Sequence, residues 1–379
     1  MKIAINAMSA VAGGGVTYIK NLLTHLLKIN TTHQFLILTT HAGKELFYFQ
    51  HPNFTFLSFK LPSINFIFRL CWEQLFLPVF LKDTHVDVLF SPANVCPLFT
   101  NIPNIVMIQN VEPFNAAVSK NRSFLLKKTR LRLLRRLSLL SIKKAQMTLF
   151  PSTQARVDIE KYGVRIRHAE VVYHGINKEL FHPCHDDKKA NQVKQKYGLD
   201  KFILFVSHIQ RYKNFLELIK AFVLLNGRID KDIRLVFAGR CFDREYYDEM
   251  QAFIAGHGYQ GRIIFLGSIP YEELPYLYSS CKLFVFPSTC ESFGMSLVEA
   301  MACGAPILAS RLEPMPEICA DAAIYFDPTN PAAMAEIIFN TLNDQRLISA
   351  LTKKSLERAV CFSWENTAKK TLKIFEGIP

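Results

Sequence analysis

The chain has 379 residues, which is too long for one small domain and enough for two or three domains that each bury a core. Half of the residues are hydrophobic and 20% are charged, which excludes a disordered chain. Lys and Arg number 45 against 32 Asp and Glu, and the net charge of +13 favours anionic partners: phosphorylated ligands, nucleic acid or an acidic membrane surface.

Cysteine usage and the apolar runs indicate the compartment. Nine scattered cysteines do not form a disulfide framework and are typical of reduced thiols in a cytosolic protein. The apolar runs are short, so we expect no transmembrane helix. Asn6 and Ser9 interrupt the apolar N-terminus, which we interpret as a first strand at residues 2–6 rather than a signal peptide. The expected location is cytoplasmic, with the inner face of the cell membrane as an option.

Short apolar runs alternate with longer helical segments along the chain. A first series of strands is predicted at residues 3–5, 35–39, 54–59, 86–90, 105–108, 147–150 and 170–173. A second series is predicted at residues 202–206, 234–238, 263–266, 283–286, 306–309 and 323–326. Continuous apolar strands separated by helices indicate parallel sheets covered on both faces, and two series indicate two doubly wound, Rossmann-like α/β domains.

The domain boundary is predicted in the polar stretch after the first series. Residues 178–201 contain Pro183 and no long apolar run, so we place the linker there. The domains are then residues 1–177 and 178–361. The last helix, within residues 362–379, follows the final strand, and we consider that it packs back on the first domain.

Two loops at the carboxyl ends of predicted strands could bind anions. Gly13, Gly14 and Gly15 follow the first strand and precede a helix, although they do not form a dinucleotide fingerprint and could be a plain turn. The loop at residues 207–214 follows the first strand of the second series, and Lys213 lies near the start of the next helix. A cation there is unfavourable unless an anion lies between it and the helix, although a solvated basic loop is the alternative.

The most informative segment is residues 287–304, where a buried strand ends, a polar turn follows and Gly294 opens a helix that Gly304 ends. Glu291 lies on the turn and Glu299 lies in the helix. Backbone amides between them could hold phosphate oxygens, and the carboxylates could accept hydrogen bonds from sugar hydroxyls. A capping role for the two acids is the alternative.

These residues carry a resemblance to a known family. The stretch E-S-F-G-M-S-L-V-E-A-M-A-C-G-A-P, with Glu291 and Glu299 eight apart, resembles the motif of the retaining family 4 glycosyltransferases of GT-B fold (glycosyl transferases group 1). The stretch V-V-Y-H-G-I-N-K-E-L-F-H-P at residues 171–183 resembles the segment that joins the two domains in that family. The resemblance covers nearly the whole chain and implies two Rossmann-like domains that face a cleft.

The resemblance also implies roles for single residues. Glu299 is expected to hold the donor ribose, Glu291 the transferred sugar, and Lys213 the departing diphosphate. The family often has an arginine five residues before this lysine; here that position is His208, so either His208 or Arg211 is expected to make the second phosphate contact. Further donor contacts are expected from Gly14, Gly15, Ile269, Phe293, Gly294, Met295, Ser296 and Leu297.

The first domain is expected to bind the acceptor. Where many relatives carry His-Asp after the fifth strand, this chain has Gln109 and Asn110, which cannot act as a general base at neutral pH. This fits a retaining reaction in which the leaving phosphate takes the acceptor proton. No metal ion and no other cofactor is expected, because the Asp230–Asp232 pair precedes a strand, at the wrong edge of the sheet.

A basic helix is predicted between residues 120 and 144, which contain ten basic residues and no acid: Lys120, Arg122, Lys127, Lys128, Arg130, Arg132, Arg135, Arg136, Lys143 and Lys144. We place Leu126, Leu133, Leu137 and Leu140 on one face, with Lys128, Arg132 and Arg135 opposite. The pattern is typical of a membrane-surface helix that would suit a lipid-linked acceptor. A domain helix with its leucines in the core is the alternative.

Three functions remain open from the sequence. The first is transfer of a hexose, mannose or a similar sugar, from a UDP- or GDP-sugar to a glycan or lipid-linked acceptor in surface-polysaccharide or lipopolysaccharide synthesis. The second is a nucleotide-sugar epimerase or a phosphorylase of the same fold, although the groups that these need are not evident. The third is a basic membrane- or nucleic-acid-binding protein without catalysis, although no recognition module for nucleic acid is present.

Overall fold

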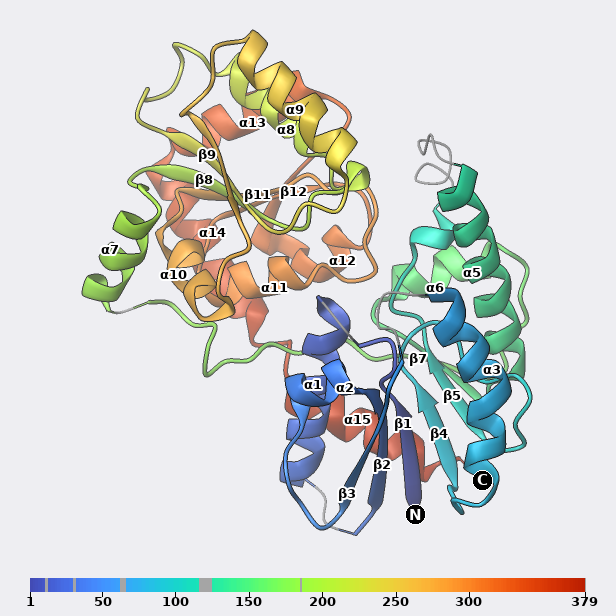
Figure 1. The fold of residues 1–379 in the computed structure, drawn as a ribbon. Helices are drawn as coiled ribbons and strands as arrows, with labels where there is room; N and C mark the ends of the chain where they lie inside the picture. Colours follow the sequence, from blue (N-terminus) through green and yellow to red (C-terminus); the bar gives the residue numbers. More distant parts are fainter. Residues whose placement is uncertain (11–12, 30–31, 62–65, 116–124, 185, 379) are drawn as a thin grey trace. The chain divides into compact units, whose positions relative to one another are not determined.

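The computed structural model describes residues 1–10, 13–29, 32–61, 66–115, 125–184 and 186–378 (Figure 1). The chain forms two compact units. Unit 1 consists of Met1–Gly175 and Ser363–Pro379, and unit 2 of Ile176–Phe362. Each unit has its own parallel sheet, so the two doubly wound domains predicted from the strand pattern are confirmed.

Unit 1 is built on a seven-stranded parallel sheet of order β3-β2-β1-β4-β5-β6-β7. Its strands are β1 (Lys2–Asn6), β2 (Gln34–Thr40), β3 (Phe54–Phe59), β4 (Val88–Ser91), β5 (Asn104–Met107), β6 (Met147–Phe150) and β7 (Ala169–Val171). Its helices are α1 (Gly14–Ile29), α2 (His41–Phe47), α3 (Phe66–Lys82), α5 (Leu125–Lys144), α6 (Thr153–Glu160) and α15 (Trp364–Glu376). The strand order reverses beside β1, which is where the carboxyl edge of a doubly wound sheet offers room for a ligand.

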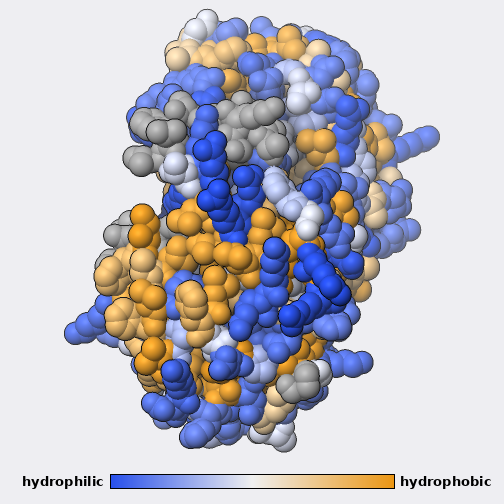
Figure 2. Space-filling view, turned by 90° about the vertical axis from the view of Figure 1, so that its right-hand side faces the viewer, coloured by the Kyte–Doolittle hydropathy of each residue, from blue (hydrophilic) through white to orange (hydrophobic). Residues whose placement is uncertain are grey.

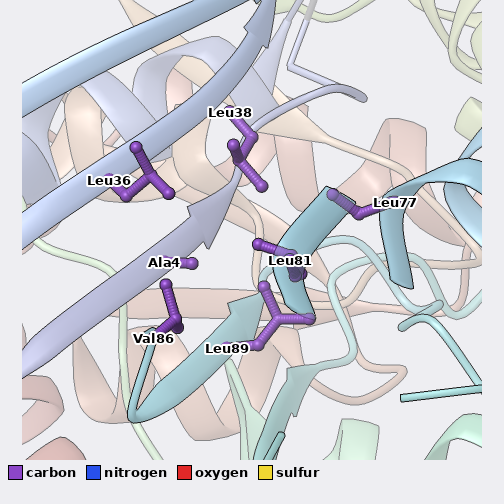
Figure 3. Packing of buried hydrophobic residues seen from close by; sticks show 7 residues of the cluster. All are labelled: Ala4, Leu36, Leu38, Leu77, Leu81, Val86 and Leu89. Atoms are coloured by element: carbon purple, nitrogen blue, oxygen red, sulfur yellow. The ribbon is translucent and has the colours of Figure 1, made fainter. Parts of the chain in front are cut away.

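Helices cover both faces of this sheet. Leu89 of β4 belongs to a buried cluster with Leu77 and Leu81 of α3, whereas the next residue, Phe90, contacts Phe375 of α15 with ring centroids 5.3 Å apart. Because successive strand residues point to opposite faces, α3 and α15 lie on opposite faces of the sheet. The full cluster under α3 consists of Ala4, Leu36, Leu38, Leu77, Leu81, Val86 and Leu89 (Figure 3).

The C-terminal helix α15 belongs to unit 1 and packs against α1. Trp364, at the start of α15, is buried against Tyr18 of α1 with ring centroids 5.7 Å apart. A side chain at Gly175 would overlap the returning backbone, because a Cβ there would lie 2.0 Å from the backbone nitrogen of Trp364. Only glycine therefore lets the two chain segments at the unit boundary pass this closely.

Unit 2 has a six-stranded parallel sheet of order β10-β9-β8-β11-β12-β13. Its strands are β8 (Phe202–Val206), β9 (Arg234–Ala238), β10 (Ile263–Gly267), β11 (Leu283–Phe286), β12 (Ile307–Ser310) and β13 (Ala323–Phe326). Its α-helices are α7 (Asp187–Lys196), α8 (Phe215–Leu224), α9 (Arg244–Gly256), α10 (Leu274–Ser280), α11 (Met295–Ala302), α12 (Met315–Cys319), α13 (Pro331–Leu342) and α14 (Gln345–Ala359).

The segment predicted as a linker is largely folded, so that prediction is wrong in its details. Asp186 caps helix α7, which packs against α10 and is tied to it through Lys196, 2.7 Å from Glu273. Both elements belong to unit 2, and the unit boundary falls earlier, after Gly175. The prediction failed because α7 is polar on most of its surface and buries only Val193, so its sequence lacks an apolar stripe.

Candidate functional site

The loops at the carboxyl edge of the unit 2 sheet are joined by hydrogen bonds. The loop after β11 is tied to the loop after β8, because both the backbone nitrogen and the hydroxyl of Thr289 donate to the carbonyl of Tyr212, each at 2.9 Å. The loop after β9 meets the loop after β8 through Ile209 N and the Arg240 carbonyl at 2.8 Å. Residues far apart in the sequence are therefore held at one edge of the sheet.

Lys213 and Glu291 form an ion pair at this edge. The Lys213 Nζ lies 2.5 Å from Glu291 Oε1, and the two side chains are 15% and 11% exposed. Lys213 comes from the short 3₁₀ turn Arg211–Lys213 after β8, and Glu291 from the turn after β11. A mostly buried ion pair that water still reaches can exchange partners with a charged ligand.

Helix α11 opens beside Glu291. Its N-cap, Gly294, has φ 89°, a left-handed conformation that favours glycine, and no side chain caps the helix there. Met295 and Ser296 at the first turn are half-buried, whereas Phe293 and Leu297 point into the core. The amides at a helix N-terminus attract anions, so this turn offers a phosphate-binding surface next to Lys213 and Glu291.

Glu299 forms a second cluster, one turn into α11. Its two carboxylate oxygens accept hydrogen bonds from the hydroxyls of Tyr271 at 2.8 Å and Tyr278 at 2.9 Å. Glu299 is buried, and burial raises its pKa to about 7. Each carboxylate oxygen has a second lone pair, so the group can still accept from a ligand hydroxyl. Sequence reasoning did not find the two tyrosines, whose spacing gives no motif.

His208 and Arg211 do not both face Glu291. Burial, together with the nearby cations Lys213 and Arg240, lowers the pKa of His208, so its ring is neutral at neutral pH. The Arg211 guanidinium pairs with Glu249 of α9 at 2.7 Å and lies over the ring of Tyr246. A phosphate contact by Arg211 would require this ion pair to open.

Arg240 is a cation at this edge that the sequence analysis did not single out. It follows β9 directly, is exposed, and donates to the hydroxyl of Ser268 after β10 at 3.0 Å. Gly239 before it allows the loops to approach, because a Cβ there would lie 2.0 Å from the carbonyl oxygen of Ser207. The signal was available, since a Gly-Arg pair at the end of a predicted strand has the position of a ligand-binding loop.

The candidate residues of unit 1 lie at the carboxyl edge of its own sheet. Gly14 and Gly15 begin helix α1, and a Cβ at Gly14 would meet no atom within 4 Å. The backbone nitrogens of Gln109 and Asn110 donate to the side-chain oxygen of the buried Asn94 at 3.0 and 2.8 Å. Asn94 therefore fixes the loop that presents Gln109 and Asn110, a role that sequence reasoning missed.

Within the parts of the chain that the structure describes, no three His, Cys, Asp or Glu side chains are grouped so that they could hold a metal ion. Asp230 and Asp232 lie, as predicted, on an exposed turn that leads into β9, and Asp230 pairs with Lys201 at 2.6 Å. Ile269 lies half-buried in the loop after β10.

Comparison with known proteins gives the family. Residues 169–358 match the family model described as Glycosyl transferases group 1, and residues 12–180 match the model described as Glycosyltransferase Family 4. The chain therefore belongs to the glycosyl transferases group 1 family, family 4, as the Glu-x7-Glu stretch predicted.

Two curated relatives come from Escherichia coli. The chain is 33% identical over 187 residues to O-antigen chain mannosyltransferase B, a match that covers 48% of each chain. It is 32% identical over 190 residues to serotype-specific mannosyltransferase WbdA, which covers 50% of this chain and 23% of that protein. The chain thus aligns with half or less of the length of these relatives.

Solved structures show the same fold over the whole chain. The HepE protein of Anabaena, in complex with UDP and glucose, has a TM-score of 0.80 at 18% identity, with both chains fully covered. WaaG, a glycosyltransferase involved in lipopolysaccharide biosynthesis, has a TM-score of 0.76 at 16% identity and covers 99% of this chain and 100% of its own. Both units therefore have the fold expected of the GT-B class.

Proposed function

We propose that the protein is a retaining hexosyltransferase that moves mannose or a similar sugar from a nucleoside-diphosphate sugar to a glycan or lipid-linked acceptor. The observation that carries this proposal is the Lys213–Glu291 pair beside the uncapped start of α11. A cation, a carboxylate and backbone amides within one edge of a sheet match the phosphates and hydroxyls of an activated sugar.

The chemistry follows from the charges that form when the anomeric bond breaks. Positive charge grows on the sugar and negative charge on the departing diphosphate. Lys213 and the amides of Met295 and Ser296 stabilise the diphosphate with little reorganisation, because the fold already holds them in place. Glu291, released from Lys213 as the phosphate arrives, accepts hydrogen bonds from hydroxyls of the transferred sugar.

Glu299 accepts hydrogen bonds from the donor ribose in this proposal, and its two tyrosines fix the carboxylate. Arg240 is the better second cation for the diphosphate, because His208 is neutral and Arg211 is paired with Glu249. Gly14 and Gly15 remain proposed donor contacts, since their backbone is open to a ligand at the start of α1.

Gln109 and Asn110 cannot act as a base for the acceptor proton, since amides do not titrate at neutral pH. We propose that the leaving phosphate takes this proton and that the two amides orient the acceptor. The reaction is then expected to proceed without a metal ion. Activity that is abolished by a chelator and restored by Mg²⁺ would contradict this part of the proposal.

The acceptor class rests on the relatives and on α5. O-antigen chain mannosyltransferase B and WbdA supply, by their names, the surface-polysaccharide context and the sugar. The described part of α5 exposes Arg130, Arg132, Arg136, Lys143 and Lys144, which suit the headgroups of an anionic membrane at the cytoplasmic face. Lys120 and Arg122 of the predicted basic stretch lie outside the described residues. No helix in the described segments is long and apolar enough to cross a membrane.

Ligand-induced thermal stabilisation tests the proposal. Purified protein is heated with UDP, GDP, ADP and their sugar conjugates, because a ligand that binds only the native state raises Tm. We expect one nucleoside diphosphate and its sugar conjugate to stabilise the protein, and the Lys213→Ala variant to lose most of the shift. The stabilising conjugate is then used in a transfer assay. Interconversion of the free nucleotide sugar would favour the epimerase instead, and release of a sugar 1-phosphate from a glycan and inorganic phosphate would favour the phosphorylase.

A further inference from the structure

Helix α3 exposes a row of large hydrophobic side chains. The fractional exposures are 64% for Ile67, 50% for Phe68, 60% for Leu75, 63% for Phe76 and 61% for Val79. We call these five residues the α3 apolar face. Figure 2 shows hydrophobic residues gathered in its lower part, on the side of unit 1 where Figure 1 places α3. A soluble protein rarely leaves so much contiguous apolar surface in water without a use for it.

The core under α3 is formed by other side chains of this helix. The opposite side of α3 supplies what the core requires, since Leu77 and Leu81 are fully buried under it (Figure 3). The helix is therefore apolar on two sides and buries only one in the protein. Covering large aliphatic or aromatic side chains is favourable in proportion to the apolar area removed from water, so the α3 apolar face can contribute to binding.

Helix α5 lies next to α3. Gln74 of α3 donates to the carbonyl of Cys96 at 3.0 Å, and the backbone nitrogen of Cys96 donates to Ser141 of α5 at 3.0 Å. One residue thus bridges the two helices. A basic surface therefore adjoins the α3 apolar face.

The exposed side of α5 carries leucines as well as cations. Leu133 and Leu140 are 41% and 48% exposed, while Leu131 and Ile142 are buried. Two leucines of the stripe that we predicted from the sequence, Leu133 and Leu140, therefore point to water, and the core alternative is wrong for these two, whereas Leu137 is half-buried. The side chain of Leu126 lies outside the described residues. Arginines and lysines flank these two leucines, which is the arrangement of a helix that lies in a membrane interface.

We infer that the α3 apolar face and the exposed side of α5 form one docking surface for an anionic lipid bilayer. The apolar side chains of α3 enter the headgroup region and the cations of α5 contact lipid phosphates. Charge argues for a bilayer over a second copy of the chain, because two copies would bring like charges of α5 together. The inference rests on the membrane contact proposed above for α5 and adds α3 as its hydrophobic half.

The natural cysteines offer a test on the unaltered protein. Cys71 of α3 and Cys361 of unit 2 are both exposed. Vesicles of phosphatidylcholine and phosphatidylglycerol are mixed with the protein, and labelling by a water-soluble maleimide is followed at each cysteine. We expect the vesicles to slow labelling of Cys71 by at least about tenfold, because a docked α3 is shielded from water. Cys361 should be unaffected, and equal rates at Cys71 with and without vesicles would overturn the inference.

Substitution separates the two halves of the surface. A Leu75→Ser, Phe76→Ser and Val79→Ser variant should sediment with the same vesicles about 10- to 100-fold less strongly, since three apolar contacts are lost. A matched control changes Leu224→Ser and Val360→Ser in unit 2, which are exposed by 51% and 65%, and should bind vesicles normally. Equal binding by the α3 variant would contradict the role of α3.

Two further readouts distinguish other outcomes. If the parent is a dimer by light scattering and the α3 variant is a monomer with unchanged vesicle binding, a second copy covers the face and the inference is wrong. In the proposed function α3 takes no part in nucleoside diphosphate binding, so thermal stabilisation by nucleoside diphosphate should be unchanged in the α3 variant. If nucleoside diphosphates do not raise the Tm of the parent, the proposed transferase is wrong. Vesicle binding still decides the role of α3 in that case.

Discussion

The two units share a doubly wound fold and differ in net charge and in the apolar side chains that they expose. Unit 1 contains 24 Lys and Arg against 10 Asp and Glu, a net charge of +14, whereas unit 2 contains 21 and 22, a net of −1. The whole excess of positive charge therefore lies in unit 1. Unit 1 also contains the α3 apolar face, which has no counterpart among the exposed hydrophobic residues of unit 2 in the described structure.

This difference shows that the doubly wound fold determines where a ligand can bind, whereas the side chains determine which kind of ligand binds. Unit 2 has nearly equal numbers of cations and acids, and at the carboxyl edge of its sheet Lys213 and Glu291 form a pair. Unit 1 has an excess of cations and exposes the α3 apolar face. The first pattern suits a small ligand that exchanges partners with internal pairs, and the second suits a large anionic surface.

The largest effect is expected from Lys213 in unit 2. Replacing it by alanine removes a preorganised cation from the departing diphosphate, so kcat should fall by about 100- to 1,000-fold, or about 3–4 kcal/mol. Steady-state transfer with the stabilising nucleotide sugar measures this.

Lys220 of α8 provides the control for Lys213. It pairs with Glu217 of the same helix at 2.7 Å, and Lys220→Ala should leave kcat within about twofold because it takes no part in the proposed donor contacts. A similar loss in both variants would assign the effect to the charge of unit 2 as a whole rather than to Lys213.

The sequence was sufficient to predict the sheets and to select Lys213 and Glu291, which the structure brings together. Each strand is a short apolar run between polar loops, so its pattern survives without tertiary information, and β11 appears where it was predicted. Glu291 and Lys213 were found because each stands directly after such a strand. Tyr271, Tyr278 and Arg240 were missed because their roles arise from contacts across loops, which no local spacing encodes.

The faces of α5 show a second limit of sequence reasoning. Leucine at helical spacing predicts an apolar stripe, but the stripe can face the core or an external apolar phase. In this helix the buried side includes Leu131, Ser138, Ser141 and Ile142. Because two of these residues are serines, a search for apolar residues at helical spacing does not find this side. Helix α7 was missed for the related reason that its burial is slight.

A second comparison between the units uses two buried carboxyl groups. Burial raises the pKa of Glu73 in α3 and of Glu299 in α11 to about 7, from an ordinary value of 4.5. Between these pH values the folded state keeps a proton that the unfolded state has released. The protonated carboxyl group therefore adds to the free energy of unfolding. This contribution is complete below about pH 4.5 and is lost as the pH rises through about 7.

Glutamine cannot ionise, so Glu299→Gln should become more stable than the parent as the pH rises, by on the order of 3 kcal/mol above pH 7. Calorimetry between pH 5 and pH 8 measures the difference. Glu73→Gln should give the same pH trend and keep nucleoside diphosphate binding, whereas Glu299→Gln should lose it. Unchanged ligand binding in Glu299→Gln would contradict the proposed ribose contact.

A smaller effect is expected from Arg240. Arg240→Ala should lower kcat/KM by about tenfold, because it removes one charge-assisted contact to the diphosphate and leaves Lys213 in place. Arg211→Ala is the matched comparison at the same edge, and its effect should be smaller because its guanidinium is held by Glu249. If Arg211→Ala lowers kcat/KM more than Arg240→Ala does, the second phosphate contact is made by Arg211.

The smallest single effects are expected on the surface of unit 1. Each of Arg132, Arg136 and Lys143 is exposed on α5, and each change to Gln should weaken binding to anionic vesicles by about 1 kcal/mol, close to fivefold. Lys194→Gln on α7 of unit 2 removes the same charge from the chain and should have no effect on the vesicles. Because the attraction is electrostatic, the difference between the α5 variants and the parent should shrink at high salt, where only the α3 apolar face still contributes. Equal weakening by Lys194→Gln would mean that the total charge, and not its concentration on unit 1, governs binding.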